Sequence, residues 1–164
     1  MPDIVVQTRM AITIAVVTVR EIRPARWDTP DGARPANACG GPPYHLIFTP
    51  VLVEVEQYVR GAQPARTLLL AADGGQVGPD RFWPSTIDGY RIDEFHVGAR
   101  MIVFLNQPNG SLQAIGSTTL WQAPFHYSIT ADDMVTVRAK ESFDRRTIPL
   151  RQLLDEIAAV KPLP

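Results

Sequence analysis

The residues best suited to metal or acid–base chemistry in this sequence form one short cluster, DEFH. It contains Asp93, Glu94 and His96, and the other two histidines, His45 and His126, lie far away along the chain. A zinc site needs three or four ligands held on a rigid frame. We therefore interpret the cluster as a solvated loop that leads into a strand, and we predict no bound metal and no cofactor.

Patterns for nucleophilic catalysis and phosphate binding are missing from the sequence. No serine stands in a nucleophile-elbow or Ser-x-x-Lys context. Gly74, Gly75 and Gly78 are followed by no Lys-Ser/Thr pair and are interpreted as turn glycines. Cys39 is the only cysteine, which excludes an intramolecular disulfide and a cysteine-based metal site. We predict that the protein is not an enzyme; an enzyme whose histidines and carboxylates converge in space is our third hypothesis.

Two predicted loops carry aromatic residues beside arginine. Trp27 follows Arg26 in the first loop, and Phe82 and Trp83 follow Arg81 in the second. Exposed aromatic and arginine side chains anchor protein interfaces, and they also stack bases in single-strand nucleic-acid grooves. The other interpretation is that the aromatics fold inward as lids over the ends of a barrel, which buries their apolar area. We predict these five residues as the partner- or ligand-binding site.

The elements that position these loops are predicted to be β-strands. The clearest signal lies in residues 46–60, where valines on one face alternate with glutamates on the other. A connection over 62–66 and a return strand over 67–72 predict an antiparallel pair.

Two strands change the phase of their apolar alternation. The phase before Thr49-Pro50 differs from the phase after it, which predicts a bulge or an edge position there. Residues 4–22 are typical of one long strand or two fused strands, with a change of phase between Val16 and Val17. This change predicts a sharp bend that lets one strand belong to both sides of a barrel.

The middle of the chain alternates between loops and one buried strand. Residues 23–43 are rich in proline and glycine without apolar periodicity, and they predict a long loop. Residues 73–98 contain too many turn residues for a long helix. Residues 100–105 are apolar on both faces, which predicts a strand covered by the barrel interior on one side and by a helix or loop on the other. The segment NQPNG at 106–110 predicts a hairpin turn.

The last third of the chain predicts two strands and a helix. Residues 121–129 alternate as a strand, with Pro124 placing it at an edge. Residues 134–138 form a short final strand. An amphipathic helix is predicted over about 149–160, because its apolar residues follow the helical stripe and Pro149 is tolerated in its first turn.

Composition bounds the fold and the partners. The 164 residues fit a single β-barrel domain over 1–164 with the C-terminal helix packed on it, in an all-β (mainly β) class with long loops. The net charge of −1 provides no global field for nucleic acid or an anionic membrane. The apolar run at 10–19 is too short to span a bilayer and has no signal-peptide features. We expect a cytoplasmic protein, or an extracytoplasmic one whose export signal has been removed.

The strand segments carry a family resemblance over nearly the whole chain. The segments TPVLVEVEQYVRG, DGGQVG, FHVGARMIVFL and LRQLLDEIAAV, together with the opening VVTVREIRPARWDTPDG, resemble a family of poorly characterised bacterial domains. The resemblance implies an exported or cell-surface protein with a small Greek-key barrel similar to oligonucleotide/oligosaccharide-binding (OB) or netrin-like folds. Netrin-like protease inhibitors depend on an N-terminal cysteine and several disulfides, which this chain does not have, and no catalytic motif accompanies the resemblance.

Two binding functions follow from these observations. The leading hypothesis is a non-enzymatic β-barrel module that binds a protein partner in a surface or envelope assembly. The alternative is an OB-type binder of single-stranded nucleic acid or glycan, against which the net charge stands, because phosphate binding draws most of its affinity from lysine and arginine.

Overall fold

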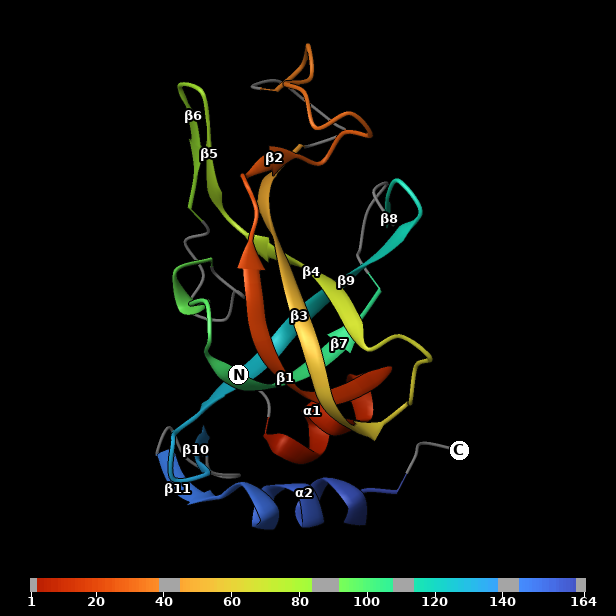
Figure 1. Ribbon diagram of the computed structural model, residues 1–164, viewed down its shortest axis with the longest axis vertical. Coiled ribbons are helices and arrows are strands. Elements are labelled where there is room, and N and C mark those ends of the chain that lie inside the picture. The colour runs from red at the N-terminus through yellow and green to blue at the C-terminus, as the bar shows by residue number, and fades with distance from the viewer. Residues whose placement is uncertain (1–2, 39–44, 84–91, 108–113, 139–144, 162–164) are drawn as a thin grey trace.

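Five strands close into a small barrel (Figure 1). We describe a computed structural model of the protein, which covers residues 3–38, 45–83, 92–107, 114–138 and 145–161. The barrel strands are β1 (Thr13–Ile22), β3 (Ile47–Arg60), β4 (Thr67–Asp73), β7 (Arg100–Asn106) and β9 (Thr118–Ile129). The other elements are α1 (Ile4–Met10), β2 (Arg26–Trp27), β5 (Gly75–Val77), β6 (Asp80–Phe82), η1 (Ile92–Glu94), β8 (Ala114–Ile115), β10 (Met134–Arg138), β11 (Arg145–Pro149) and α2 (Leu150–Ala159).

The strand order identifies the barrel as OB-like. Strand β1 pairs with β3 and with β7, β3 pairs with β4, and β7 pairs with β9, each time antiparallel. A parallel pairing of β4 with β9 closes the ring. A closed five-stranded Greek-key barrel of this kind is the OB architecture. The predicted class, a mainly β protein with an OB-like barrel and a C-terminal helix, is confirmed.

The barrel interior is a continuous apolar cluster. Alternate residues of the strands point inward, as the two-residue period of a strand requires. Phe95, which directly follows η1, also belongs to this cluster. The inner cluster consists of Ala15, Val17, Val19, Val51, Val53, Leu68, Leu70, Ala72, Phe95, Met101, Val103, Leu105, Trp121 and Ala123.

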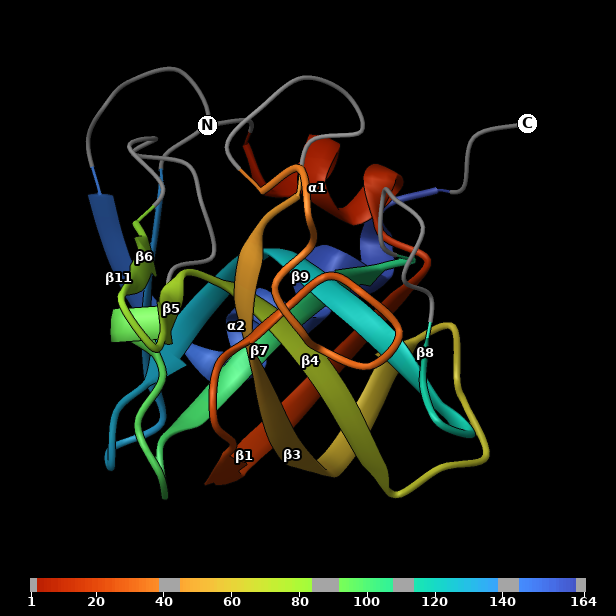
Figure 2. The same cartoon turned by 90° about the horizontal axis from the view of Figure 1, so that it is seen from above.

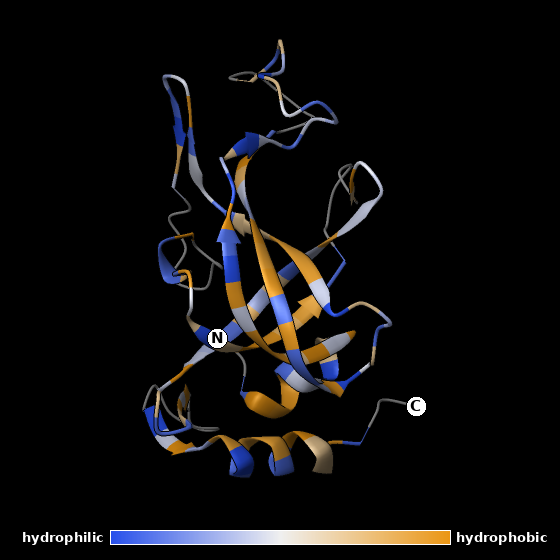
Figure 3. Ribbon diagram, viewed as in Figure 1, coloured by the Kyte–Doolittle hydropathy of each residue, from blue (hydrophilic) through white to orange (hydrophobic). Residues whose placement is uncertain are grey.

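A second core lies outside the barrel, between its wall and the two helices. Figure 3 shows the apolar side of α2 turned toward the rest of the molecule and its polar side turned away. Strands β1 and β7 contribute to both clusters, so the prediction that residues 100–105 are covered on both faces is confirmed. The outer cluster consists of Ile4, Ile14, Val16, Ile102, Phe104, Phe125, Ile129, Val135, Val137, Ile148, Leu150, Leu153 and Ile157.

The two cores explain the phase changes seen in the sequence. Residues Thr13 to Val17 are all buried because both faces of β1 are covered. The pairing of β1 with β3 does shift between Val16 and Val17, where Val16 faces Gln57 and Val17 faces Val55. The extra residue on β3 makes a bulge at the predicted position, and such a bulge bends the paired strands.

Strand pairing tests both predictions about proline positions in strands. Pro50 pairs with Ala71 in an unbroken register between β3 and β4, so no bulge lies there. On the other side of β3, pairing with β2 ends at Phe48 and pairing with β1 begins at Val51, so Pro50 lies at a gap in the pairing, as the edge alternative predicted. The apolar phase changes because the start of β3 is buried on both faces. Pro124 lies where β9 is paired on one side only, as the predicted edge position requires, because β9 pairs with β4 only at Leu120 and Trp121 and with β10 only at Ile129. It lies at a bulge between the pairs Phe104–Phe125 and Asn106–Gln122, where the pairing is interrupted.

Residues 4–10 form a helix, and the predicted strand there is wrong. The carboxylate of Asp3 accepts a hydrogen bond from the backbone N–H of Val6 at 2.9 Å and caps the first turn. The buried residues Ile4, Gln7 and Thr8 follow helical spacing. The β-branched residues that favoured a strand are therefore overridden by a local cap and by packing.

The C-terminal part confirms the helix and adds a strand. Helix α2 begins at Leu150 and not at 149, because Pro149 is its N-cap and the last residue of β11. Strand β11 was not predicted; it pairs antiparallel with β10 over five residue pairs. Among the described residues, no helix is long and apolar enough to cross a membrane.

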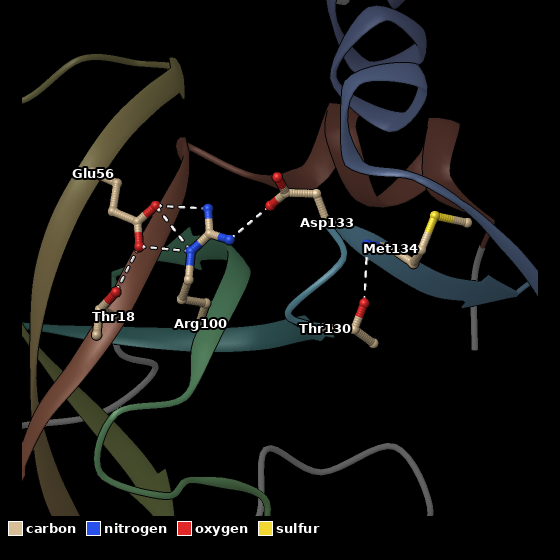
Figure 4. A network of polar contacts seen from close by, with 6 residues as sticks. All are labelled: Thr18, Glu56, Arg100, Thr130, Asp133 and Met134. Atoms are coloured by element: carbon tan, nitrogen blue, oxygen red, sulfur yellow. Dashed lines mark hydrogen bonds and ion pairs between the residues drawn. The ribbon is translucent and has the colours of Figure 1, made fainter.

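A polar network ties the barrel wall to the turn between β9 and β10 (Figure 4). Arg100 donates hydrogen bonds to Glu56 and, at 2.7 Å, to Asp133, while Thr18 donates to Glu56. The hydrogen bond from Arg100 lowers the pKa of the Glu56 carboxyl. The chain turns at 130–133, where Asp133 donates its N–H to the carbonyl of Thr130.

Candidate partner-binding site

The predicted site residues lie at one end of the barrel, opposite the helices (Figure 1). Two short elements carry them: β2 holds Arg26 and Trp27, and the β5–β6 hairpin with the residue after it holds Arg81, Phe82 and Trp83. Figure 2 shows the molecule from this end of the barrel. We call this region the loop end.

Trp27 is buried at the loop end. Strand β2 pairs with β3 so that Trp27 lies opposite Ile47. Residues directly opposite on paired strands point to the same face, and Ile47 has the inward parity of Val51 and Val53. The Trp27 side chain is only 6% exposed, as the interpretation of the aromatics as lids expected. Its indole N–H is buried without an acceptor among the described residues.

Arg26 is used to shape its own loop. One guanidinium nitrogen donates to the carbonyls of Thr29 and Pro30, both at 2.9 Å. The backbone of Gly32 lies so close that an added Cβ would be 2.9 Å from the guanidinium carbon. The guanidinium group of Arg26 therefore stabilises a turn of its own loop and is not available as a donor to a partner.

The second group lies on a hairpin that the sequence did not predict. Gly75 pairs with Phe82, Gln76 with Arg81, and Val77 with Asp80. The tip needs a left-handed residue, which Gly78 provides at φ +56°. The segment GQVGPDRF does contain a turn signal between residues suited to strands, and this signal could have revealed the hairpin.

Trp83 is exposed and holds an arginine against its ring. Its side chain is 42% exposed, and the guanidinium carbon of Arg81 lies 4.9 Å from the ring centroid. This is a cation–π contact. Phe82 beside it is half-buried. Arg81 and Trp83 are therefore exposed together at the base of the hairpin.

Contacts with β2, β3 and the loop after β2 fix the hairpin in place. Thr49 on β3 donates its hydroxyl to the carbonyl of Gly74 at 2.8 Å. An added Cβ on Gly75 would be 2.5 Å from the Cβ of Ala25. Farther out, Arg34 forms an ion pair with Asp80 at 2.7 Å. The two groups of predicted site residues therefore belong to one connected region.

Asp73 is a partly buried carboxyl at the junction of the two groups. It ends β4 and lies opposite Phe48 on β3, while Arg26 lies opposite Phe48 on the other side. Burial raises the pKa of Asp73 to about 6. None of the described residues bonds to its carboxylate, and no pattern in the sequence distinguishes Asp73 from an ordinary turn aspartate.

One residue of the DEFH cluster lies against His126 on β9. The carboxylate of Glu94 lies 2.5 Å from Nε2 of His126, and the ring of Phe95 packs 5.0 Å from the imidazole. Nδ1 of the same ring faces the carbonyl of Ala123 at 3.4 Å, so both ring nitrogens face protein oxygens. His45 pairs instead with Asp28, at 2.8 Å.

No candidate group of metal ligands assembles in the described part of the chain. Over these residues, no three histidine, cysteine, aspartate or glutamate side chains come together as metal ligands would. Cys39 lies outside the described residues.

The face that OB barrels use for ligands is apolar in this protein. In OB folds, oligonucleotides and oligosaccharides bind over the second and third strands, which correspond to β3 and β4. Their outer face forms a small buried cluster, with Leu52 and Ile115 packed against it. The residues of the cluster are Phe48, Leu69, Ala71 and Leu120.

Comparisons with known proteins add no further assignment. No family model matches the chain, and no curated protein and no solved structure matches it. The OB-like barrel is seen in the structure, whereas the netrin-like and cell-surface parts of the family resemblance stay predictions.

Proposed function

We propose that this protein is a non-enzymatic β-barrel module that binds a protein partner through Arg81, Phe82 and Trp83 at the loop end. One observation carries the proposal: a tryptophan that is 42% exposed stacks with an arginine on a hairpin fixed to the barrel. Tryptophan and arginine are the residues most enriched among energetically dominant interface contacts. A fixed hairpin presents them with little loss of conformational entropy on binding.

The charges at the loop end favour a protein over a nucleic acid. Arg34 is paired with Asp80, Arg23 with Glu21, and Arg26 donates to backbone carbonyls. Binding to phosphates needs several cations that are not already paired. At the loop end, the guanidinium group of Arg81 lies over the ring of Trp83 and not against a hydrogen-bond acceptor. The surface is therefore suited to an apolar and hydrogen-bonding partner.

The first experiment is an affinity capture with the tagged protein from its native source, with soluble and surface fractions kept apart. We expect a stoichiometric protein in the surface fraction, in agreement with the surface or envelope assembly that the sequence predicted. Trp83→Ala should weaken that capture at least about tenfold, as the loss of an interface anchor does. A partner in the soluble fraction alone would refute the assembly but keep the binding role.

A matched control separates the hairpin from general surface hydrophobicity. Val97 is 66% exposed and lies outside the loop-end groups, so Val97→Ala should leave capture unchanged. If Val97→Ala and Trp83→Ala weaken capture equally, the hairpin is not the binding site.

The OB-like strand order supports a second candidate, a binder of single-stranded nucleic acid or glycan. Titrating labelled single strands and oligosaccharides at low and high salt tests it. Salt-sensitive binding of the strands at micromolar protein, lost in Arg81→Gln, would replace the protein-partner proposal.

A further inference from the structure

A hollow of about 450 Å³ lies between α1 and the C-terminal end of α2. The two helices lie next to each other at the end of the molecule opposite the loop end (Figure 1). A volume of this size is within the range of small-molecule sites. The hollow is lined by Ile4, Val5, Arg9, Glu156, Ala159, Val160 and Lys161.

The wall of the hollow is apolar and continues onto the surface. Ile4 belongs to the outer cluster, and Val5 packs against that cluster. On the solvent side of α1, Val6 is 41% exposed and Met10 is 54% exposed. Val6 lies three residues before Arg9 and four before Met10, so these side chains are neighbours on the surface of α1.

Two uncommitted cations stand at the mouth. Arg9 and Lys161 are exposed, and no residue that the structure describes pairs with either one. The one acidic lining residue, Glu156, is occupied by an ion pair with Arg146 and a hydrogen bond from Gln152. The hollow therefore combines an apolar interior with an uncompensated positive rim.

We propose that this hollow binds a free medium-chain fatty acid. The alkyl chain lies in the apolar hollow between α1 and α2, and the carboxylate faces Arg9 and Lys161. Burial of the chain supplies the affinity, and charge-assisted hydrogen bonds select the anionic headgroup. This site is separate from the loop end, so it stands independently of the proposed protein partner.

Two other negatively charged, amphipathic partners, an anionic membrane and an acidic protein helix, fit the hollow less well. Adsorption to an anionic membrane needs a cluster of several cations, whereas the exposed face of α2 carries Asp155 beside Arg151. An acidic helix from a protein would need on the order of 800 Å² of surface on each partner. The recessed hollow and its two cations match one acyl chain with one carboxylate.

The test is calorimetric titration of the full chain with laurate below its micelle concentration, with dodecanol as the uncharged analogue of the same length. We expect laurate to bind about tenfold more tightly than dodecanol. The double variant Arg9→Gln with Lys161→Gln should lose that preference while it still binds dodecanol. Arg151→Gln, on the exposed face of α2, is the matched control and should leave both affinities unchanged.

A second variant blocks the hollow itself. Ala159 is exposed at the last position of α2, so Ala159→Trp should fold normally, as circular dichroism can verify, and should abolish binding of both ligands. Equal affinity for laurate and dodecanol, or full binding in Ala159→Trp, overturns the proposal. Binding to phosphatidylglycerol vesicles without binding of monomeric laurate would also overturn it.

Discussion

The β2 region and the β5–β6 hairpin carry nearly the same short motif and give it opposite uses. Both place an arginine beside an aromatic residue near proline and glycine. In β2, pairing with β3 turns Trp27 inward until it is 6% exposed. In the hairpin, the strands pair with each other, and Trp83 stays at the surface with Arg81 on its ring.

The difference teaches that the strand partner, and not the motif, decides whether the tryptophan is buried or exposed. The side chain of a residue paired with a barrel strand points to the same face of the sheet as the residue opposite it. The strands of the β5–β6 hairpin pair with each other, so no barrel strand sets the direction of their side chains. Arginine follows the same division, since Arg26 donates to the carbonyls of its own loop while Arg81 remains at the surface.

The largest expected effect is on stability at Trp27. Trp27→Ala should lower the free energy of unfolding by about 3–5 kcal/mol, because a large buried side chain leaves a cavity. Trp83→Ala should change it by less than about 0.5 kcal/mol, as surface substitutions do. Urea denaturation of both variants measures the two values. Similar losses in both would mean that the hairpin tryptophan is also a lid and would end the comparison.

Two turn glycines, one in each region, allow the same comparison to be made for the backbone. Gly32 and Gly78 both have positive φ, +74° and +56°, but only Gly32 lies against the guanidinium of Arg26. Gly78→Ala should cost about 1 kcal/mol for left-handed strain alone. Gly32→Ala should cost roughly twice that, because it also displaces Arg26 from its carbonyls. Thermal unfolding of the two variants side by side reports the difference; equal costs would show that Arg26 is free to move.

Asp73, between the two regions, predicts a pH dependence. Burial raises its pKa from 3.8 to about 6, so the folded state holds its proton more tightly than the unfolded state. This group therefore lowers stability as the pH rises through that window, and the loss is complete above it.

The matching variant is Asp73→Asn, which removes this titration. We expect it to be about 1 kcal/mol more stable than the parent at neutral pH and equal to it below the lower pKa; the partly exposed side chain reduces the full effect of the shift. Denaturation at several pH values measures this, with Asp132→Asn, an exposed turn carboxyl, as the control. A stability gain that does not vary with pH would contradict the assignment.

The smallest effect is expected at the ion pair that joins the two regions. A double-mutant cycle with Arg34→Ala and Asp80→Ala should give a coupling below about 1 kcal/mol that declines with added salt. A larger coupling would mean that this ion pair holds the hairpin against the loop after β2 more strongly than a surface ion pair does.

Regular elements could be predicted from the sequence, because each has its own apolar period. Strand β7, with both faces apolar, was correctly expected between two layers, and α2 was located to within a residue at each end. Residues 4–10 were mistaken for a strand, because their β-branched composition outweighed a single capping aspartate. Strand β11 and the β5–β6 hairpin were missed, because short strands carry too few residues to show a period.

The site residues were found by type, but their surroundings were not predictable. Exposure of Trp27 and Trp83 depends on strand pairing over long separations in the chain. The contact of Glu94 with His126 likewise joins η1 to β9, and no local sequence pattern predicts it. The burial of Asp73 depends on neighbours from other strands in the same way.

The parallel pairing of β4 with β9 has a consequence for how the barrel opens. This seam consists of two residue pairs, Leu69 with Leu120 and Leu70 with Trp121, whereas β3 and β4 share seven. Local openings of a protein begin where the fewest hydrogen bonds must break. We expect the amide protons along this seam to exchange with solvent faster than those between β3 and β4, so that the ring opens at its closing joint while the β1–β3–β4 meander remains intact.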